Sequence, residues 1–158
     1  MLATSEFRVV AYETRHADAF RDLNISWIEE YFEVEEIDRR YLLHPEETIL
    51  RQGGAILVAE DRNGILGVCA LVLHSPGRYE VSKMAVRTDV RGLGIGRRLL
   101  SEVISHARTL GARRLFIISN RILEPAIHLY RQLGFLEVPL PREQEYERGN
   151  IALELDLT

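Results

Sequence analysis

A run of arginines and glycines in the second half of the chain has the composition of a phosphate-binding turn. Residues 91–97 read R-G-L-G-I-G-R, between an apolar stretch that ends at Val86 and a stretch with helical periodicity. Alternate glycines leave backbone N–H groups uncovered by side chains. The first turn of a helix adds unpaired N–H groups and a partial positive charge. We therefore expect a phosphate-bearing cofactor to bind at this turn.

Two common phosphate-binding motifs do not fit the spacing. A P-loop requires Lys-Ser/Thr after the glycines, but Arg97 and Arg98 follow Gly96. A dinucleotide fingerprint requires a sixth-position glycine, and the sixth position counted from Gly92 is Arg97. The pattern that remains is Arg-x-x-Gly-x-Gly.

The elements around this turn are expected to form one mixed α/β layer. Apolar alternation and β-branched residues predict strands at 7–12, 55–60, 65–73, 79–86, 113–119, 135–138 and 150–157. Near-helical apolar spacing predicts helices at 17–31, 38–43, 46–52, 95–110 and 124–133. The fold class is α/β, with a mostly antiparallel sheet, one parallel βαβ crossover and helices on both faces.

Local signals refine these elements. Thr14 and Asp38 are expected to be N-caps of the first and second helices. Asn24 and Ser26 interrupt the apolar spacing, so the first helix is expected to bend or break there. Asn63-Gly64 predicts a tight hairpin between two strands.

Length and composition limit the class of protein. The 158 residues are expected to form a single domain, 1–158, and the net charge of −4 argues against bulk nucleic-acid binding. No window approaches 18 apolar residues, and Met1 to Glu6 lack the features of a signal peptide. We expect a cytoplasmic protein that does not bind membranes, with its oligomeric state open, a homodimer included.

From residue 80 to residue 135 the sequence resembles the GNAT superfamily of acyl-CoA-dependent N-acyltransferases. Met84-Ala85-Val86 precedes the glycine turn at the family spacing, and Asn120 follows the next strand. Residues 126–135, A-I-H-L-Y-R-Q-L-G-F, match the family ending A-x-x-L-Y-x-x-x-G-F. The combination is far more specific than the glycine pattern alone.

The resemblance implies that acetyl-CoA is the acyl donor. In the family, the strand backbone pairs with the pantetheine arm, the turn binds the pyrophosphate, and the asparagine after the next strand bonds the arm. The arginines of the turn would add charge-assisted contacts. Carried onto this sequence, the cofactor-binding residues are Met84, Ala85, Val86, Arg91, Gly92, Leu93, Gly94, Ile95, Gly96, Arg97 and Asn120. Asn120 is also explained as a loop-forming asparagine.

Two residues are candidates for catalysis. Tyr130 occupies the place where the family carries a tyrosine near the cofactor sulfur, and it would protonate the leaving thiolate. Packing beside Leu133 explains it as well, and the two roles are compatible. Glu80 is the first choice of base and shares a strand face with Met84 unless a bulge intervenes. An exposed strand-end glutamate is the alternative, and deprotonation through water alone would need no base.

The acceptor is expected to bind between the early helices and the segment before the last strand. Trp27 and Tyr31 would line this pocket or simply belong to the core. Arg148 would hold a substrate carboxylate, or be an ordinary loop arginine. Lys83 is unusual inside a strand. It would pair with an acidic residue or an acidic substrate group, although a surface lysine is the simpler interpretation.

These observations predict direct acetyl transfer from acetyl-CoA to a primary amine of a small molecule or peptide, in a ternary complex. The alternative is a non-catalytic acyl-CoA-binding regulatory domain. The five histidines form no i, i+4 pair and have no companion cysteines, so no metal site is predicted.

Overall fold

The computed structural model describes residues 6–158; Met1 to Ser5, on which we based the expectation of no signal peptide, lie outside the described residues. Within this range the strands are β1 (Arg8–Ala11), β2 (Ala55–Asp61), β3 (Gly64–Ser75), β4 (Arg78–Val86), β5 (Arg114–Ser119), β6 (Leu136–Val138) and β7 (Ile151–Asp156). The α-helices are α1 (Ala17–Tyr31), α2 (Glu36–Leu43), α3 (Ile95–Thr109) and α4 (Glu124–Gln132). Short 3-10 turns cover Thr14–His16 and Thr88–Val90, and a π-helical turn covers Glu46–Leu50.

The described strands form one mixed sheet in the order β1-β2-β3-β4-β5-β7-β6. All neighbouring strands are antiparallel except β4 and β5, which the crossover helix α3 connects in parallel. Asn63 lies in the tight turn between β2 and β3, as its sequence signal predicts. The mixed sheet with one parallel pair is therefore confirmed.

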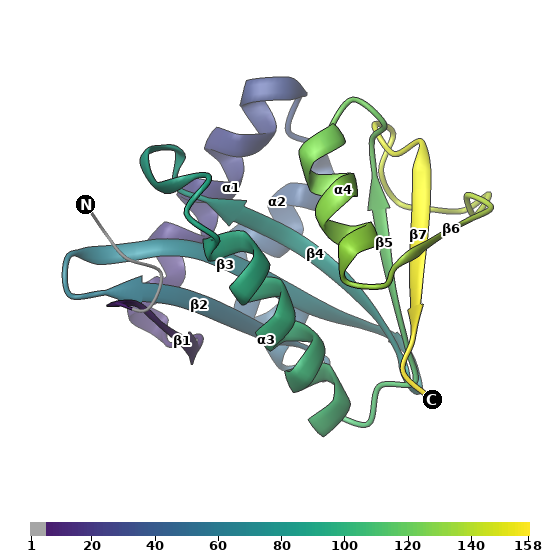
Figure 1. Ribbon diagram of the computed structural model, residues 1–158, viewed down its shortest axis with the longest axis horizontal. Coiled ribbons are helices and arrows are strands. Elements are labelled where there is room, and N and C mark those ends of the chain that lie inside the picture. Colours follow the sequence, from purple (N-terminus) through teal and green to yellow (C-terminus); the bar gives the residue numbers. More distant parts are fainter. Residues whose placement is uncertain (1–5) are drawn as a thin grey trace.

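Helices cover both faces of the sheet, with α3 and α4 in front and α1 and α2 behind in the view of Figure 1. Strand β2 shows why both faces are covered. Leu57 and Ala59 belong to the core under α3 and α4, whereas Ile56 and Val58 belong to the core under α1 and α2. Burial of apolar side chains on alternate sides holds both helical layers on the sheet.

Three local expectations about the early helices were wrong. Thr14 opens a 3-10 turn, and α1 begins only at Ala17. The helix is continuous through Asn24 and Ser26, and the side-chain Nδ2 of Asn24 donates to the backbone oxygen of Phe20 at 2.9 Å. The N-cap of α2 is Glu35, whose backbone N–H donates to the Asp38 carboxylate at 2.8 Å in a capping box.

None of the helices within residues 6–158 combines the length and the apolar character needed to cross a membrane.

Candidate active site

The parallel pairing of β4 and β5 ends after three residue pairs. The last pair is Glu80 with Phe116, and beyond it the two strands separate, as Figure 1 shows. One edge of β4 stays paired with β3 as far as Val86. The other edge faces a cleft that lies between β4 and β5. We call this cavity the cofactor cleft; its walls include Lys83 and Met84 of β4 and Asn120 after β5.

A β-bulge distorts β4 where it borders the cofactor cleft. Val68 pairs with Ala85 and Ala70 pairs with Ser82, so two residues of β4, Lys83 and Met84, lie opposite the single residue between them on β3. Lys83 has φ +54°, a left-handed conformation that is rare for residues with a side chain. Met84 consequently packs against the core under α3 and α4.

The same bulge decides the position of Glu80. In a regular strand Glu80 and Met84 would share a face, but the extra residue puts them on different sides of the sheet. Glu80 is buried, so the alternative of an exposed strand-end glutamate was wrong. Its Oε1 lies 2.8 Å from His74 Nε2 of β3. The hydrogen bond to Glu80 raises the pKa of His74 above its usual value, against the opposing effect of burial.

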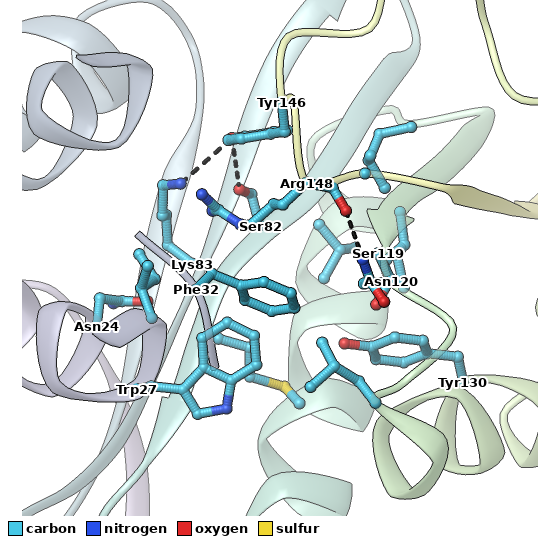
Figure 2. Close-up of a pocket in the computed structure, with 17 residues that line it drawn as sticks. Asn24, Trp27, Phe32, Ser82, Lys83, Ser119, Asn120, Tyr130, Tyr146 and Arg148 are labelled. Carbon is cyan, nitrogen blue, oxygen red and sulfur yellow. Dashed lines mark hydrogen bonds between the residues drawn. The ribbon is translucent and has the colours of Figure 1, made fainter. Parts of the chain in front are cut away.

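Tyr130 of α4 closes the cofactor cleft on the side opposite Trp27 and Phe32, and its hydroxyl points into the cavity (Figure 2). Its ring packs beside Phe135. Burial raises the pKa of the phenol well above its usual range, so the group keeps its proton at neutral pH. A protonated hydroxyl in this place has the geometry of a proton donor to a ligand in the cleft.

The glycine turn has the backbone conformation that its composition suggests. Gly92 and Gly94 have φ +82° and +83°, and Gly94 is the N-cap of α3. A Cβ placed on Gly92 would have no neighbour within 4 Å, so the turn is open at this position. Gly96 differs, since its Cβ would make ordinary contacts with Val86 and Leu129. The open turn and the first turn of α3 fit the phosphate groups of an acyl-CoA.

Both arginines of the turn already have partners on other elements. Arg91 donates to Glu30 of α1 at 3.2 Å, and Arg97 donates to Gln132 of α4 at 2.8 Å. Both side chains are solvent-exposed, so these contacts are exchangeable with those to a phosphate.

Opposite the turn, four charged side chains form a network that we call the buried ion cluster: Glu35, Asp38, Lys83 and Arg148. Asp38 is fully buried and accepts hydrogen bonds from Lys83 Nζ at 2.5 Å and from both terminal nitrogens of Arg148 at 2.7 and 2.8 Å. Arg148 also donates to Glu35 at 3.1 Å. The two acidic and two basic groups balance in charge.

The cluster explains why Lys83 is tolerated inside a strand. Only 3% of its side chain is exposed, so the simpler interpretation of a surface lysine was wrong and pairing with an acidic residue is confirmed. Burial lowers the pKa of Lys83, and the Asp38 carboxylate opposes this change. Burial would raise the pKa of Asp38, but Arg148 and Lys83 outweigh it and lower that pKa to about 2. Asp38 is therefore ionised at neutral pH.

Tyr146 joins the cluster to the cofactor cleft. Its hydroxyl accepts from Lys83 Nζ at 3.3 Å and lies 3.3 Å from Ser82 Oγ, as the dashed lines in Figure 2 mark. The guanidinium of Arg148 and the ammonium of Lys83 lie 5.0 and 4.6 Å from the centre of its ring. These contacts fix the loop before β7 against β4 and α2.

Asn120 ties the end of β5 to this loop. Its Nδ2 donates to the backbone oxygen of Arg148 at 2.7 Å, and its Oδ1 accepts from Ile122 N–H at 3.0 Å. Its side chain borders the cleft, so a contact with a bound pantetheine stays a prediction. The loop-forming role is observed.

Of the two remaining residues predicted to bind the acceptor, only one lines the cofactor cleft. Trp27 lines the cofactor cleft, whereas Tyr31 lies outside its lining, 45% exposed and packed against the ring of Trp27 at 5.9 Å. Sequence reasoning gave no site role to Asp38, which it treated only as a helix cap, or to His74 and Tyr146. Lys83, unusual inside a strand, indicated that an acidic residue lies next to it. The sequence does not show that this residue is Asp38.

The comparison with known families agrees with this geometry. The model of the acetyltransferase (GNAT) family matches residues 18–135, more than half of the chain. The chain belongs to the GNAT family. The resemblance between residues 80 and 135 is thereby confirmed, and the match extends upstream over the helices on the other face of the sheet.

Two curated relatives of this GNAT chain carry acetyltransferase names. An uncharacterised N-acetyltransferase of Schizosaccharomyces pombe is 34% identical over 52% of this chain and 52% of its own length. An IAA acetyltransferase of Azospirillum brasilense is 34% identical over 66% of this chain and 74% of its own length. The matched region thus spans about half of the first relative.

Solved structures share the fold over nearly the whole chain. A GNAT-family acetyltransferase of Staphylococcus aureus superposes with a TM-score of 0.87 at 20% identity, over 96% of this chain and 99% of its own. A GNAT phosphinothricin acetyltransferase of Sinorhizobium meliloti, solved in complex with acetyl-CoA, has a TM-score of 0.78 at 20% identity, over 96% and 89%. At this identity the likeness concerns the fold.

Proposed function

We propose that this GNAT protein is an N-acetyltransferase that moves the acetyl group of acetyl-CoA directly to a primary amine of a small molecule or a peptide. The observation that carries the proposal is the cofactor cleft: the unpaired edge of β4 lies beside it, and the Tyr130 hydroxyl points into it. A strand edge with free backbone groups pairs with an extended amide-containing arm. The acetyl-CoA complex of the Sinorhizobium relative supports this donor.

The residues of the chain divide into binding and chemical roles. The backbone of Met84, Ala85 and Val86 binds the pantetheine arm, with Asn120 at the far wall. The N–H groups from Arg91 to Arg97 bind the pyrophosphate, where the open turn at Gly92 leaves room. When bound, acetyl-CoA would supply the activated acyl carbon.

The reaction needs two proton movements. The amine loses a proton as its nitrogen bonds the acyl carbon, and the thiolate gains one as the C–S bond breaks. Tyr130 keeps its proton at neutral pH, which suits it to the second step. Glu80 is an acceptor for the first, since His74 holds one of its oxygens and orients the carboxylate. Direct transfer needs no covalent enzyme intermediate.

Calorimetry with acetyl-CoA, followed by thiol-release assays over a panel of amines and peptides, tests this function. We expect binding below millimolar concentration and thiol release with at least one amine. Absence of binding would contradict the proposal. Binding without turnover for any amine or peptide would instead favour a non-catalytic acyl-CoA-binding regulator.

The substitution Tyr130→Phe tests whether Tyr130 protonates the leaving thiolate. The change removes one hydroxyl and keeps the ring that packs on Phe135. We expect kcat to fall by about 10²-fold or more, with acetyl-CoA affinity within about twofold of the wild type, because the change leaves the backbone that binds the donor in place. An unchanged kcat would exclude Tyr130 from proton transfer.

A further inference from the structure

A second cavity adjoins the inner end of the cofactor cleft. It has a volume of about 180 Å³, and Ile118 and Tyr146 border both cavities. Its lining includes Glu80 and Phe116, the last residues at which β4 and β5 are paired. The second cavity therefore begins where the cleft between the strands closes, and Tyr146 borders both.

Acidic groups face this second cavity from two elements. Glu80 of β4 is 3% exposed, and the only hydrogen bond described for its carboxylate in residues 6–158 joins its Oε1 to His74. Glu143 and Glu145 belong to the exposed loop before β7 and also line it. A carboxylate of Glu145 lies 3.9 Å from the second ring nitrogen of His74.

Each cationic side chain that lines either cavity already has an acidic partner among the described residues. Arg78 donates to Glu154 at 3.2 Å and lies 4.3 Å from the centre of the Phe116 ring. Lys83 and Arg148 are held by Asp38 in the buried ion cluster. A ligand carboxylate would have to displace one of these partners, and in the cluster that would leave a buried charge unpaired.

We propose that the acceptor amine binds in the second cavity, and that it is a cationic amine without a carboxylate beside its amino group. The inference rests on the proposed acetyltransferase function and specifies its substrate class. An ammonium group is attracted by the glutamates of the cavity, whereas a neighbouring carboxylate is repelled by them and, among the described lining residues, meets only cations that already have an acidic partner. The acceptor then meets the acetyl group beside Tyr146, with Glu80 within the same cavity.

Matched pairs of amines that differ by one carboxylate test the proposal. Cadaverine is compared with lysine, histamine with histidine, and tyramine with tyrosine, by thiol release at saturating acetyl-CoA. We expect kcat/KM at least tenfold higher for the decarboxylated member of every pair that is used. Equal or better use of the amino acids would overturn this inference and leave the acetyltransferase function standing. Acetyl-CoA binding without turnover of any amine would remove both.

Substitutions of glutamates on the loop before β7 test whether the cavity, rather than the net charge of the protein, determines the preference between amines. In the double variant Glu143→Gln/Glu145→Gln, the preference for the decarboxylated amine is expected to fall about three- to tenfold, with most of that change lost at 0.5 M salt. Glu147→Gln is the control for each single charge, because it removes one of the two units removed by the double variant, from the same exposed loop but outside the cavity lining. Its preference is expected to stay within twofold of the wild type. An unchanged preference in the double variant, or an equal loss in the control, would contradict recognition by this cavity.

Discussion

The two ends of the site are built in opposite ways. The turn that fits the cofactor phosphates lies within one stretch of the chain, from Val86 to Arg97, and its arginines are exposed. The buried ion cluster joins α2, β4 and the loop before β7. Its partners are 45 residues apart for Lys83 and Asp38, and 110 apart for Arg148 and Asp38.

This difference has an energetic consequence. The pair of Arg91 and Glu30 has both side chains more than one third exposed, so water and salt screen it. Asp38 and Lys83 have side-chain exposures of 0% and 3%, so loss of one partner leaves a charge buried. Changes in the buried ion cluster should therefore alter stability, and changes at the turn should mainly alter binding.

The largest expected effect comes from Asp38→Ala. The change leaves Lys83 and Arg148 without their shared counter-charge and removes the capping bond to Glu35, so we expect the free energy of unfolding to fall by about 3–5 kcal/mol. Urea denaturation measures it. Asp18→Ala, at a side chain that is 85% exposed, is the control and should change stability little. Equal losses in the two variants would contradict the contrast between buried and exposed charges.

The pH dependence of the free energy of unfolding tests the contribution of the same carboxylate, that of Asp38. The folded pKa of Asp38 is about 2, below the ordinary value of 3.8, so its ionised form stabilises the fold above pH 4 and this contribution disappears as the pH falls to 2. The difference in pKa corresponds to about 2.5 kcal/mol. In Asp38→Asn, unfolding free energies measured from pH 5 to pH 2 should show a shallower decline than in the wild type. Parallel curves would show that Asp38 titrates normally.

A smaller effect is expected within the glycine turn. Gly94 has φ +83°, and an alanine there costs about 1–2 kcal/mol in backbone strain. Gly94→Ala should thus lower both stability and acetyl-CoA affinity, the latter by about tenfold because the N–H groups are displaced. Gly96→Ala is the matched change. Its Cβ would lie 3.7 Å from Val86, an ordinary contact, so its free energy of unfolding by urea denaturation should stay close to that of the wild type. Calorimetry measures the acetyl-CoA affinity of Gly94→Ala. Equal losses of stability in the two variants would mean that backbone conformation is not what the turn requires.

The smallest effect is expected for Glu30→Gln. This substitution releases Arg91 from its exposed partner and should raise acetyl-CoA affinity about twofold at low salt, with no difference at 0.5 M salt. Glu29→Gln removes the same charge from the neighbouring exposed position of α1. An equal gain in the Glu29 variant would assign the effect to overall charge rather than to Arg91.

Much of the cofactor side could be predicted from the sequence because its determinants are local. The alternation of glycines fixes a backbone conformation within a few residues, and the hydrophobic periods of 2 and 3.6 assign strands and helices. The parallel crossover follows from an apolar strand after an amphipathic helix. The role of Tyr130 came instead from the family resemblance, and that of Glu80 from its place at the start of the strand that the resemblance assigns to the cofactor. Both roles stay proposals.

The bulge in β4 and the buried ion cluster could not be derived in the same way. The bulge at Lys83 depends on the register between β3 and β4, and one extra residue moves Met84 away from the face of Glu80. The sequence marked Lys83 as unusual, but its partner is one of 24 acidic residues, and only the packing of α2 behind the sheet brings Asp38 to it. Every carboxylate in the sequence could pair with Lys83 equally well by its local chemistry. Tertiary structure decides the pairing, because a lysine buried in the sheet requires a carboxylate at that place in the fold.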